Sequence, residues 1–353
     1  MSDLRATIKE NSVKLIGKLN QRNRDVVSRR FGLKTGAKET LESIGQSYGI
    51  TRERVRQIEE ASLKQIRGEI EKGITVKIAP FVSLAENILE QSGGVLGERQ
   101  MFERYFGGSG KILNDPANAA LTFVLALDGK IVRVPEDENY RTFWGLSEQH
   151  VQSFVGSSET LVKLFDKENK LLAAGAFADF SKKSGVSAKF CTPAGLDAIM
   201  SVSKQISKNI FGEIGLNIWP EVKPRGVRDK SFLVLKKEGK PQHFREITQL
   251  INSTFSGDRK ANVQTVHNEL IKDNRFVLVG RGLYALTEWG YKAGTVKDVL
   301  VDILRTARKP VKKEEIVAQV MSHRIVKENT VLLNLQDSRV FKKTTNGYML
   351  NEA

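Results

Sequence analysis

The chain has 353 residues, 40% of them hydrophobic and 27% charged, which is the ordinary composition of a globular protein with material for buried cores. Its single cysteine, Cys191, excludes an intramolecular disulfide and a thiolate zinc site, and indicates a reducing compartment. The polar start at Met1 and the lack of a run of about 18 apolar residues predict no signal peptide and no membrane span. We therefore expect a cytoplasmic protein of two or three domains, or more if small helical modules are present.

The formal net charge of +15 indicates a polyanionic partner. The charge is +6 over residues 1–73 (16 basic, 10 acidic), −2 over 74–222 (15 basic, 17 acidic) and +11 over 223–353 (25 basic, 14 acidic). A uniform excess would serve only solubility, whereas two basic ends around a neutral spacer favour two nucleic-acid contacts.

The first 73 residues predict a bundle of short helices. Apolar residues follow helical spacing over residues 4–31, and Gly32 is expected to end the second helix. Thr40 and Thr51 are good N-caps for a helix over 41–48 and a longer one over 52–67. Gly49 supplies a sharp turn between them, so the segment predicts a helix-turn-helix whose second helix can enter the major groove.

The middle of the chain predicts a winged-helix plan over residues 80–146, with three helices followed by a hairpin of strands at 131–134 and 140–144. Residues 150–222 could repeat this plan, with helices at 161–165, 174–182 and 195–209. No hairpin is recognisable in that second segment.

The last third contains an internal repeat. The dipeptides Lys240-Pro241 and Lys309-Pro310 are each expected to begin a helix, and each is followed by a second helix and a hairpin, at 275–286 and 339–350. Both hairpins have glycine-containing turns that permit tight reversals. Two tandem winged helices, 223–292 and 293–353, are therefore predicted, and the whole chain is expected to be mainly α-helical with small sheets.

The runs RRFGL at 29–33 and TLESIGQSYGITRERVRQIEEASLKQIR at 40–67 resemble region four of bacterial primary sigma factors, the domain that binds the upstream promoter hexamer. The resemblance covers residues 20–68. It implies base contacts from Arg52, Glu53 and Gln57 and phosphate contacts from the residues around them. These backbone-contact candidates are Thr51, Arg54 and Arg56. Ala61 stands where these sigma factors usually have lysine, so the affinity or the preferred bases are expected to differ.

Helical geometry agrees with that assignment. At about 100° per residue, the polar side chains of this helix oppose Val55 and Ile58. Arginine, glutamine and glutamate can pair with guanine, adenine and cytosine respectively. The competing interpretation is a solvated face held by ion pairs such as that of Glu53 with Arg56.

Residues 240–291 resemble the HARE type of winged helix, found in the delta subunit of bacterial RNA polymerase and in some restriction systems. Their apolar residues are expected to form a core. The basic residues of the loops and hairpins are candidates for phosphate contact, although a solvated hairpin tip is an alternative for each. These candidates are Arg259, Lys260, Arg281, Lys342 and Lys343.

Enzyme signatures are missing from the sequence. The four histidines have no metal-ligand spacing, and no metal or cofactor is expected. The GGSGK run at 107–111 resembles the end of a phosphate-binding loop, but Tyr105 replaces its first glycine and Ile112 its Ser or Thr. No catalytic residue and no small-molecule substrate are predicted.

These patterns favour a sequence-specific DNA-binding transcription factor that acts with RNA polymerase at promoters, on the nucleoid. The alternatives are an autonomous repressor or nucleoid protein, and the DNA-recognition subunit of a restriction system. Because no counterpart is found of the sigma regions that bind core polymerase and melt DNA, we do not expect the chain to replace a complete sigma factor.

Overall fold

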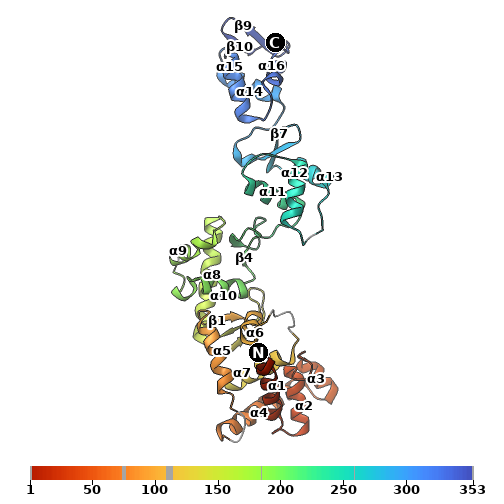
Figure 1. The fold of residues 1–353 in the computed structure, drawn as a ribbon, viewed down its shortest axis with the longest axis vertical. Coiled ribbons are helices and arrows are strands. Elements are labelled where there is room, and N and C mark those ends of the chain that lie inside the picture. The colour runs from red at the N-terminus through yellow and green to blue at the C-terminus, as the bar shows by residue number, and fades with distance from the viewer. Residues whose placement is uncertain (1, 74–76, 109–113, 184, 258, 352–353) are drawn as a thin grey trace. The chain divides into compact units, whose positions relative to one another are not determined.

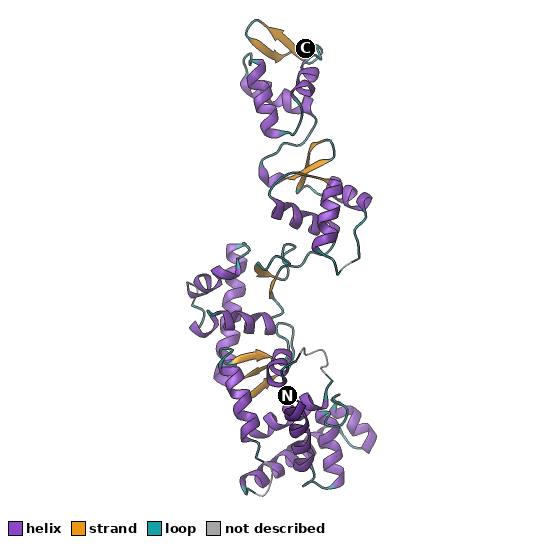
Figure 2. Cartoon of the chain, viewed as in Figure 1, coloured by secondary structure: helices purple, strands orange, loops and turns teal. Residues whose placement is uncertain are grey.

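The computed structural model describes residues 2–73, 77–108, 114–183, 185–257 and 259–351. Three residues of the GGSGK run, at 109–111, therefore lie outside the described part. The chain divides into two compact units, residues 1–208 with 212–217 and residues 209–211 with 218–353. Helices dominate both units, with small antiparallel sheets (Figure 2). Within the described ranges, no helix combines the length and apolarity needed to cross a membrane.

The N-terminal helices have the predicted order. The helices are α1 (Ser2–Ile16), α2 (Gln21–Phe31), α3 (Leu41–Tyr48) and α4 (Arg52–Glu71). As predicted, Gly32 caps α2 in the left-handed region, and Thr40 and Thr51 cap α3 and α4 through their side chains. Local capping chemistry therefore fixes where these helices begin and end.

The rest of the first unit contains two segments with similar element order. The first comprises α5 (Ala79–Glu90), β1 (Val95–Gly97), α6 (Glu98–Phe106), α7 (Pro116–Asp128), β2 (Val132–Val134) and β3 (Phe143–Gly145). The second comprises α8 (Glu148–Glu168), η1 (Ala174–Ala176), α9 (Phe177–Lys182), η2 (Ala188–Phe190), α10 (Pro193–Val202), β4 (Ile206–Lys208) and β5 (Ile214–Leu216).

The second unit also contains two such segments. The first comprises α11 (Val227–Glu238), β6 (Gln242–His243), α12 (Phe244–Thr254), α13 (Val263–Lys272), β7 (Phe276–Gly280), β8 (Leu283–Leu286) and η3 (Thr287–Trp289). The second comprises α14 (Val296–Ala307), α15 (Lys313–His323), α16 (Glu328–Leu335), β9 (Phe341–Thr344) and β10 (Gly347–Leu350). Figure 1 labels most of these elements.

All four segments share one pairing pattern. After the first helix, a short extended stretch pairs antiparallel with the last strand of the same segment. The pairs are β1 with β3, Leu172 with Ile214, β6 with β8, and Val311 with Tyr348. The last two strands of each segment pair with each other as an antiparallel hairpin. In the described residues, a helix, a short extended stretch, further helices and a hairpin therefore occur four times in the same order. The extended stretch is a strand in two segments, β1 and β6, and a single bridge in the other two.

Two predictions about the middle of the chain were wrong. The helix expected over 195–209 ends at Val202, because the Ser203 hydroxyl accepts hydrogen bonds from the backbone N–H groups of Gln205 (3.1 Å) and Ile206 (3.3 Å). Such side-chain bonds compete with the helix ladder. Beyond this turn, β4 and β5 form a hairpin that we did not recognise in the sequence.

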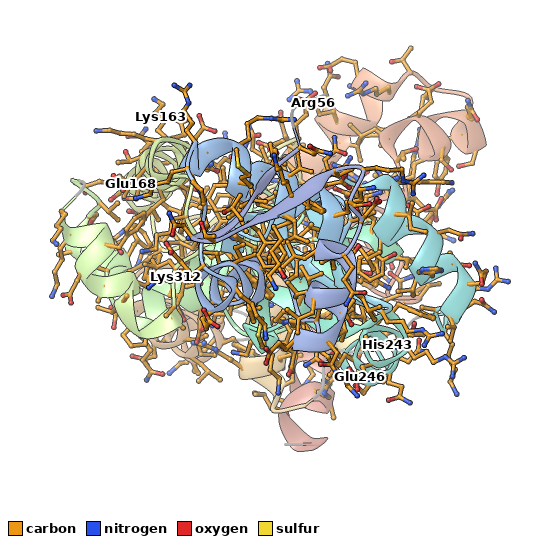
Figure 3. The ribbon with its side chains drawn as sticks, turned by 90° about the horizontal axis from the view of Figure 1, so that it is seen from above. Arg56, Lys163, Glu168, His243, Glu246 and Lys312 are labelled. Atoms are coloured by element: carbon orange, nitrogen blue, oxygen red, sulfur yellow. The ribbon has the colours of Figure 1, made fainter. Side chains whose placement is uncertain are left out.

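The helices expected to begin at Lys240-Pro241 and Lys309-Pro310 begin three residues after each proline. Proline fixes φ, lacks an N–H and favours extended backbone at the residue before it. The His243 imidazole caps α12, accepting from the Arg245 N–H at 3.3 Å, while Glu246 accepts from the His243 N–H at 3.0 Å. Figure 3 labels both ends of this capping box, His243 and Glu246.

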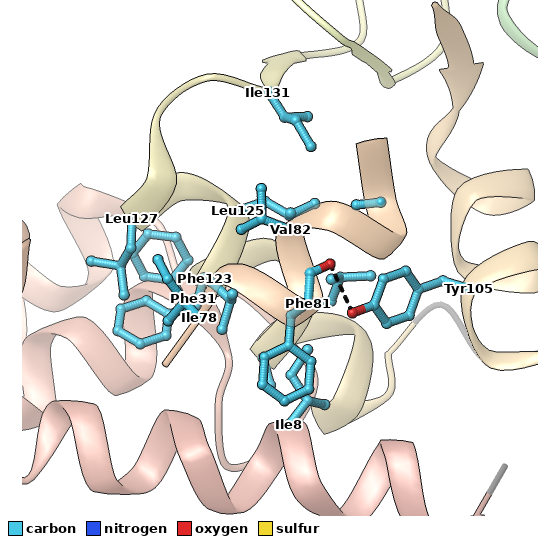
Figure 4. Close-up of a cluster of buried hydrophobic side chains, with 14 of the residues drawn as sticks. Ile8, Phe31, Ile78, Phe81, Val82, Tyr105, Phe123, Leu125, Leu127 and Ile131 are labelled. Carbon is cyan, nitrogen blue, oxygen red and sulfur yellow. Dashed lines mark hydrogen bonds between the residues drawn. The ribbon is translucent and has the colours of Figure 1, made fainter. Parts of the chain in front are cut away.

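The largest core of the first unit joins the N-terminal helices to the segment that follows them. Most of its members come from α1, α2, α4, α5, α6 and α7, with Leu96 on β1 and Trp144 on β3, and Figure 4 shows part of it. Phe31 and Phe123 meet edge to face with ring centroids 5.2 Å apart. The Tyr105 hydroxyl donates to the Phe81 carbonyl at 3.1 Å. The domain boundary expected near residue 73 remains a prediction, and the apolar packing continues across it.

Candidate nucleic-acid interface

The turn between α3 and α4 gives α4 its direction. Gly49 has φ +63°, in the left-handed region where a side chain is strained, and its N–H bonds the carbonyls of Gly45 and Gln46. Two residues later, the Thr51 hydroxyl accepts from the Arg54 N–H at 3.2 Å and starts α4. The sequence YGIT therefore ends one helix and starts the next, as the prediction required.

The inner face of α4 packs on α2 and α3. Val26, Ile44 and Val55 are completely buried and form a small separate core. Ile58 is partly buried against it. This apolar contact holds α4 across α3 and leaves the opposite face of α4 to solvent, as the helical angles predicted.

All six residues predicted to contact DNA here are exposed, and they lie at the N-cap and in the first two turns of α4. They are Thr51, Arg52, Glu53, Arg54, Arg56 and Gln57. Neither a hydrogen bond nor a salt bridge holds the Arg52 side chain among the described residues. The first two turns of α4 therefore carry one guanidinium without a partner among those residues, that of Arg52, together with a carboxylate and an amide.

Ion pairs tie part of this face together in the free protein. The Arg56 guanidinium donates two hydrogen bonds to Glu53, at 2.9 and 2.7 Å, and a third to Glu60. Arg54 donates to the Gln57 amide oxygen at 3.0 Å. The hydrogen bond from Arg56 lowers the pKa of Glu53, so this carboxylate stays ionised. Reading a base with Glu53 requires Arg56 to turn away, which its exposed position allows.

Polar contacts hold the helix-turn-helix against α2. The Tyr48 hydroxyl donates to Asp25 at 2.8 Å. Arg29 makes a bidentate pair with Glu39, at 2.9 and 2.7 Å, which raises the pKa of the guanidinium. Arg30 donates to Glu59 on α4 at 3.0 Å. These contacts join α2 to the loop before α3, to the end of α3 and to Glu59 in the middle of α4.

Sequence reasoning missed an anchor further along α4. The Arg67 guanidinium donates to the backbone carbonyls of Leu127 (2.9 Å) and Ala126 (2.8 Å), at the C-terminal end of α7. A helix C-terminus carries partial negative charge and unpaired carbonyls, so a guanidinium there is favourable. A pairing of residues about 60 positions apart has no local sequence signal.

The remaining predicted contact residues lie in the second unit and are exposed. Arg281 occupies the turn between β7 and β8, and Lys342 and Lys343 lie on β9. Arg259 and Lys260 precede α13 and are also exposed. Their positions are compatible with phosphate contact, and their role stays a prediction.

The fold and exposed face of residues 21–71 define a helix-turn-helix with a polar second helix. Residues 15–68 match the family model described as Sigma-70, region 4. Over 60 residues, the chain is 45% identical to the RNA polymerase sigma factor SigA of Nostoc sp.. Over 61 residues, it is 48% identical to the RNA polymerase sigma factor RpoS of Coxiella burnetii.

These matches are short in both partners. The alignment with the Nostoc protein covers 17% of this chain and 15% of that relative, and the alignment with the Coxiella protein covers 17% of each. The SigA of Microcystis aeruginosa is 43% identical over 60 residues, again 17% of this chain. Residues 15–68 thus match a Sigma-70 region 4 domain, and these three alignments cover 60 or 61 residues each.

Proposed function

We propose that this protein is a sequence-specific DNA-binding transcription factor that reads promoter-like DNA with the first two turns of α4. The observation that carries the proposal is the exposed set Arg52, Glu53 and Gln57, on a capped helix whose opposite side is held by buried Val55. These side chains have the donors and acceptors needed to distinguish base pairs in the major groove. Thr51, Arg54 and Arg56 would contact the flanking phosphates.

The four repeated segments are proposed to be winged-helix modules. Their element order of a helix, a short extended stretch, further helices and a hairpin supports this reading. The segment over 240–291 is the one we proposed to be of the HARE type. In the second unit, Arg281, Lys342 and Lys343 on the hairpins would hold phosphates and add affinity without reading sequence.

RNA polymerase is proposed as the protein partner, because the relatives of residues 15–68 are named as its sigma factors. The protein would then act in the cytoplasm, on the nucleoid, and without catalysing a reaction itself. Purification from its own cells after nuclease treatment tests this step. Polymerase subunits should accompany the protein, and their loss after nuclease treatment would favour an autonomous repressor or nucleoid protein.

The DNA-reading step is tested by selection from random duplexes with wild type, Arg52→Ala, Gln57→Ala and Arg54→Ala. The first two should lose about 1–3 kcal/mol of discrimination at one base position each, whereas Arg54→Ala should weaken all sequences similarly. Lys64→Ala, at an exposed position further along α4, is the matched control. If both Arg52→Ala and Gln57→Ala select the same motif as wild type, α4 does not read bases, and its polar face is a solvated face held by ion pairs.

A further inference from the structure

A hollow lies within the first unit, between the loop before α3 and the two segments that follow the helix-turn-helix. It has a volume of about 680 Å³, and Lys38, Glu98, Arg133, Arg141 and Lys204 line it. A smaller hollow of about 300 Å³ shares Lys38, Thr122 and Arg133 with it and reaches Trp144. Small-molecule sites commonly occupy about 300–1,000 Å³.

The acidic groups of the larger hollow are already paired. Glu98 accepts a bidentate pair from Arg133, at 2.6 and 3.0 Å. Glu136 accepts from Lys204 at 2.5 Å, and Arg141 donates to the Ser203 carbonyl at 2.5 Å. The lining therefore has more cationic than anionic groups, and each of its two carboxylates is already held by a cation.

Lys38 is the cation that stays without a partner. In the described part of the chain, no hydrogen bond and no salt bridge holds its ammonium group. Lys38 is exposed as a residue, but desolvation around its ammonium group, and then the charge of Arg133, lower its pKa to about 8, although Glu98 acts in the opposite direction. An ammonium group in such surroundings gains from any anion that enters.

The loop that carries Lys38 is fixed by Gly36. This residue has φ +79°, and a Cβ on it would lie 2.4 Å from the carbonyl carbon of Asn114. Only glycine permits this approach. The close backbone contact holds Lys38 beside the segment that follows the helix-turn-helix.

Trp144 supplies a second unpaired donor. Its side chain is 1% exposed and lines the smaller hollow, and its Nε1–H has no acceptor among the described residues. The Arg133 guanidinium lies 5.9 Å from the centre of the Trp144 ring. A buried donor without an acceptor is destabilising, and a ligand oxygen that accepts from it would remove that cost.

We propose that these adjoining hollows bind a small phosphorylated ligand of nucleotide size, with Lys38 and the Trp144 Nε1–H donating to its oxygens. Phosphate offers several charged acceptors at once, which matches two unpaired donors beside Arg133. The site is separate from the exposed face of α4 and does not depend on the proposed reading of DNA. The ligand would be bound and not transformed, since nothing in the lining supplies a catalytic pair.

Calorimetric titration of the full chain, without DNA, tests the site with ATP, inorganic pyrophosphate and inorganic phosphate as probes. ATP or pyrophosphate should bind, and Lys38→Met should weaken that binding at least about 10-fold, the factor that 1.4 kcal/mol represents. Lys64→Met, which removes an exposed lysine of α4 outside both hollows, should bind like wild type.

Trp144→Phe separates a ligand contact from a loss of fold. This variant removes the Nε1–H and should weaken binding several-fold while a thermal melt still shows one folded transition. If the melt shows that Trp144→Phe is unfolded, the binding measurement on Lys38→Met alone tests the proposal. The proposal is overturned if none of the three probes binds wild type, or if Lys38→Met binds as wild type does. It is also overturned if only a DNA duplex binds in a Lys38-dependent way, because the hollow would then hold a backbone phosphate.

Discussion

Helices α7 and α13 occupy the same place in two of the repeated segments, and their surroundings differ. Ten of the 13 residues of α7 are buried, and the helix packs against α1, α2, α4 and α5. Only Val266 and Leu270 are buried among the 10 residues of α13. In a winged helix, this third helix is the one that can enter a groove. On the proposed winged-helix assignment, the first segment uses this helix as internal packing, whereas most residues of the corresponding helix in the second unit are not buried.

The largest effect on stability is expected from a substitution at the centre of α7. Phe123→Ala removes a completely buried ring that contacts Phe31, and should lower the free energy of unfolding by about 3–5 kcal/mol. Asn268→Ala, at an exposed position of α13, should change it by less than about 0.5 kcal/mol. Urea denaturation measures both. Similar small losses for the two variants would mean that α7 does not serve as core.

The free surfaces of the second unit predict the next largest effect. Replacing Arg281, Lys342 and Lys343 together by alanine should reduce the slope of log affinity against log salt by about 2.7 if each meets one phosphate. Raising the salt concentration from 50 to 200 mM should therefore weaken the binding of wild type about 40-fold more than it weakens the binding of the variant. The measurement is a DNA titration at several salt concentrations.

A matched triple replacement of Lys163, Lys167 and Lys170 controls for net charge. These lysines are exposed on or just after α8, in the neutral middle of the chain. The slope should remain that of wild type in this control. Equal slopes for both triple variants would assign the hairpins of the second unit to protein contacts.

A smaller effect is expected where the two segments of the second unit meet. Arg324, only 6% exposed, donates to the carbonyls of Leu278 (2.8 Å) and Gly294, and burial lowers its pKa. The neighbouring Ile325 N–H donates to the Val279 carbonyl at 2.9 Å. Arg324→Met should cost about 1–3 kcal/mol by leaving two carbonyls without donors.

Hydrogen exchange would locate that cost. Amide protection should fall on β7 and around Gly294 in Arg324→Met, and stay unchanged in Arg305→Met, where the side chain is 71% exposed. Unchanged protection of β7 in Arg324→Met would show that the guanidinium does not hold the segments together.

The smallest effect concerns pH. Lys38 has a folded-state pKa of about 8 against an ordinary value of 10.5, so the folded protein releases a proton that the unfolded chain keeps. Its contribution therefore makes stability rise with pH between about 8 and 10.5. Desolvation is the main cause of this lowered pKa; the charges of Arg133 and Arg30 add to it, and that of Glu98 opposes it.

Subtracting the stability of Lys38→Met from that of wild type across this range isolates the lysine. The difference should rise with pH towards 10.5. A difference that stays flat would mean that the ammonium group is as well solvated in the folded protein as in the unfolded chain.

The sequence predicted features that depend on neighbouring residues and missed those that depend on distant ones. Thr40, Gly49 and Thr51 act within a few residues of themselves, so the helix-turn-helix was foreseeable in detail. Strands β1 and β6 have two or three residues each and pair with partners about 40 to 50 positions away, so they show no alternation to detect. The hollow could not be foreseen for a similar reason, because Lys38 and Trp144 are even further apart in the chain than these strand partners.

The exposed face of α4 could be predicted from the sequence, but the sequence could not decide whether its charged residues read DNA or pair with each other. Spacing indicated both the DNA-reading role and the bond between Glu53 and Arg56, and the structure contains that bond. Arg52 differs, since no hydrogen bond or salt bridge holds it in the described part. A charged helix reads bases only if contacts to DNA replace ion pairs such as that of Glu53 with Arg56. The spacing of residues along the helix does not reveal whether they do.

The shared core has a practical consequence for anyone who wishes to study the helix-turn-helix in isolation. A fragment ending at residue 73 would uncover Ile8, Leu15, Phe31 and Ile66, which α7 and its neighbours bury in the full chain. Contiguous uncovered apolar surface promotes self-association. Grafting this reader onto another protein would therefore require the whole first unit, residues 1–217, because Tyr140 and Phe143 pack in turn on Phe154 of α8. The fragment ending at residue 73 should aggregate although it contains every side chain proposed to read bases.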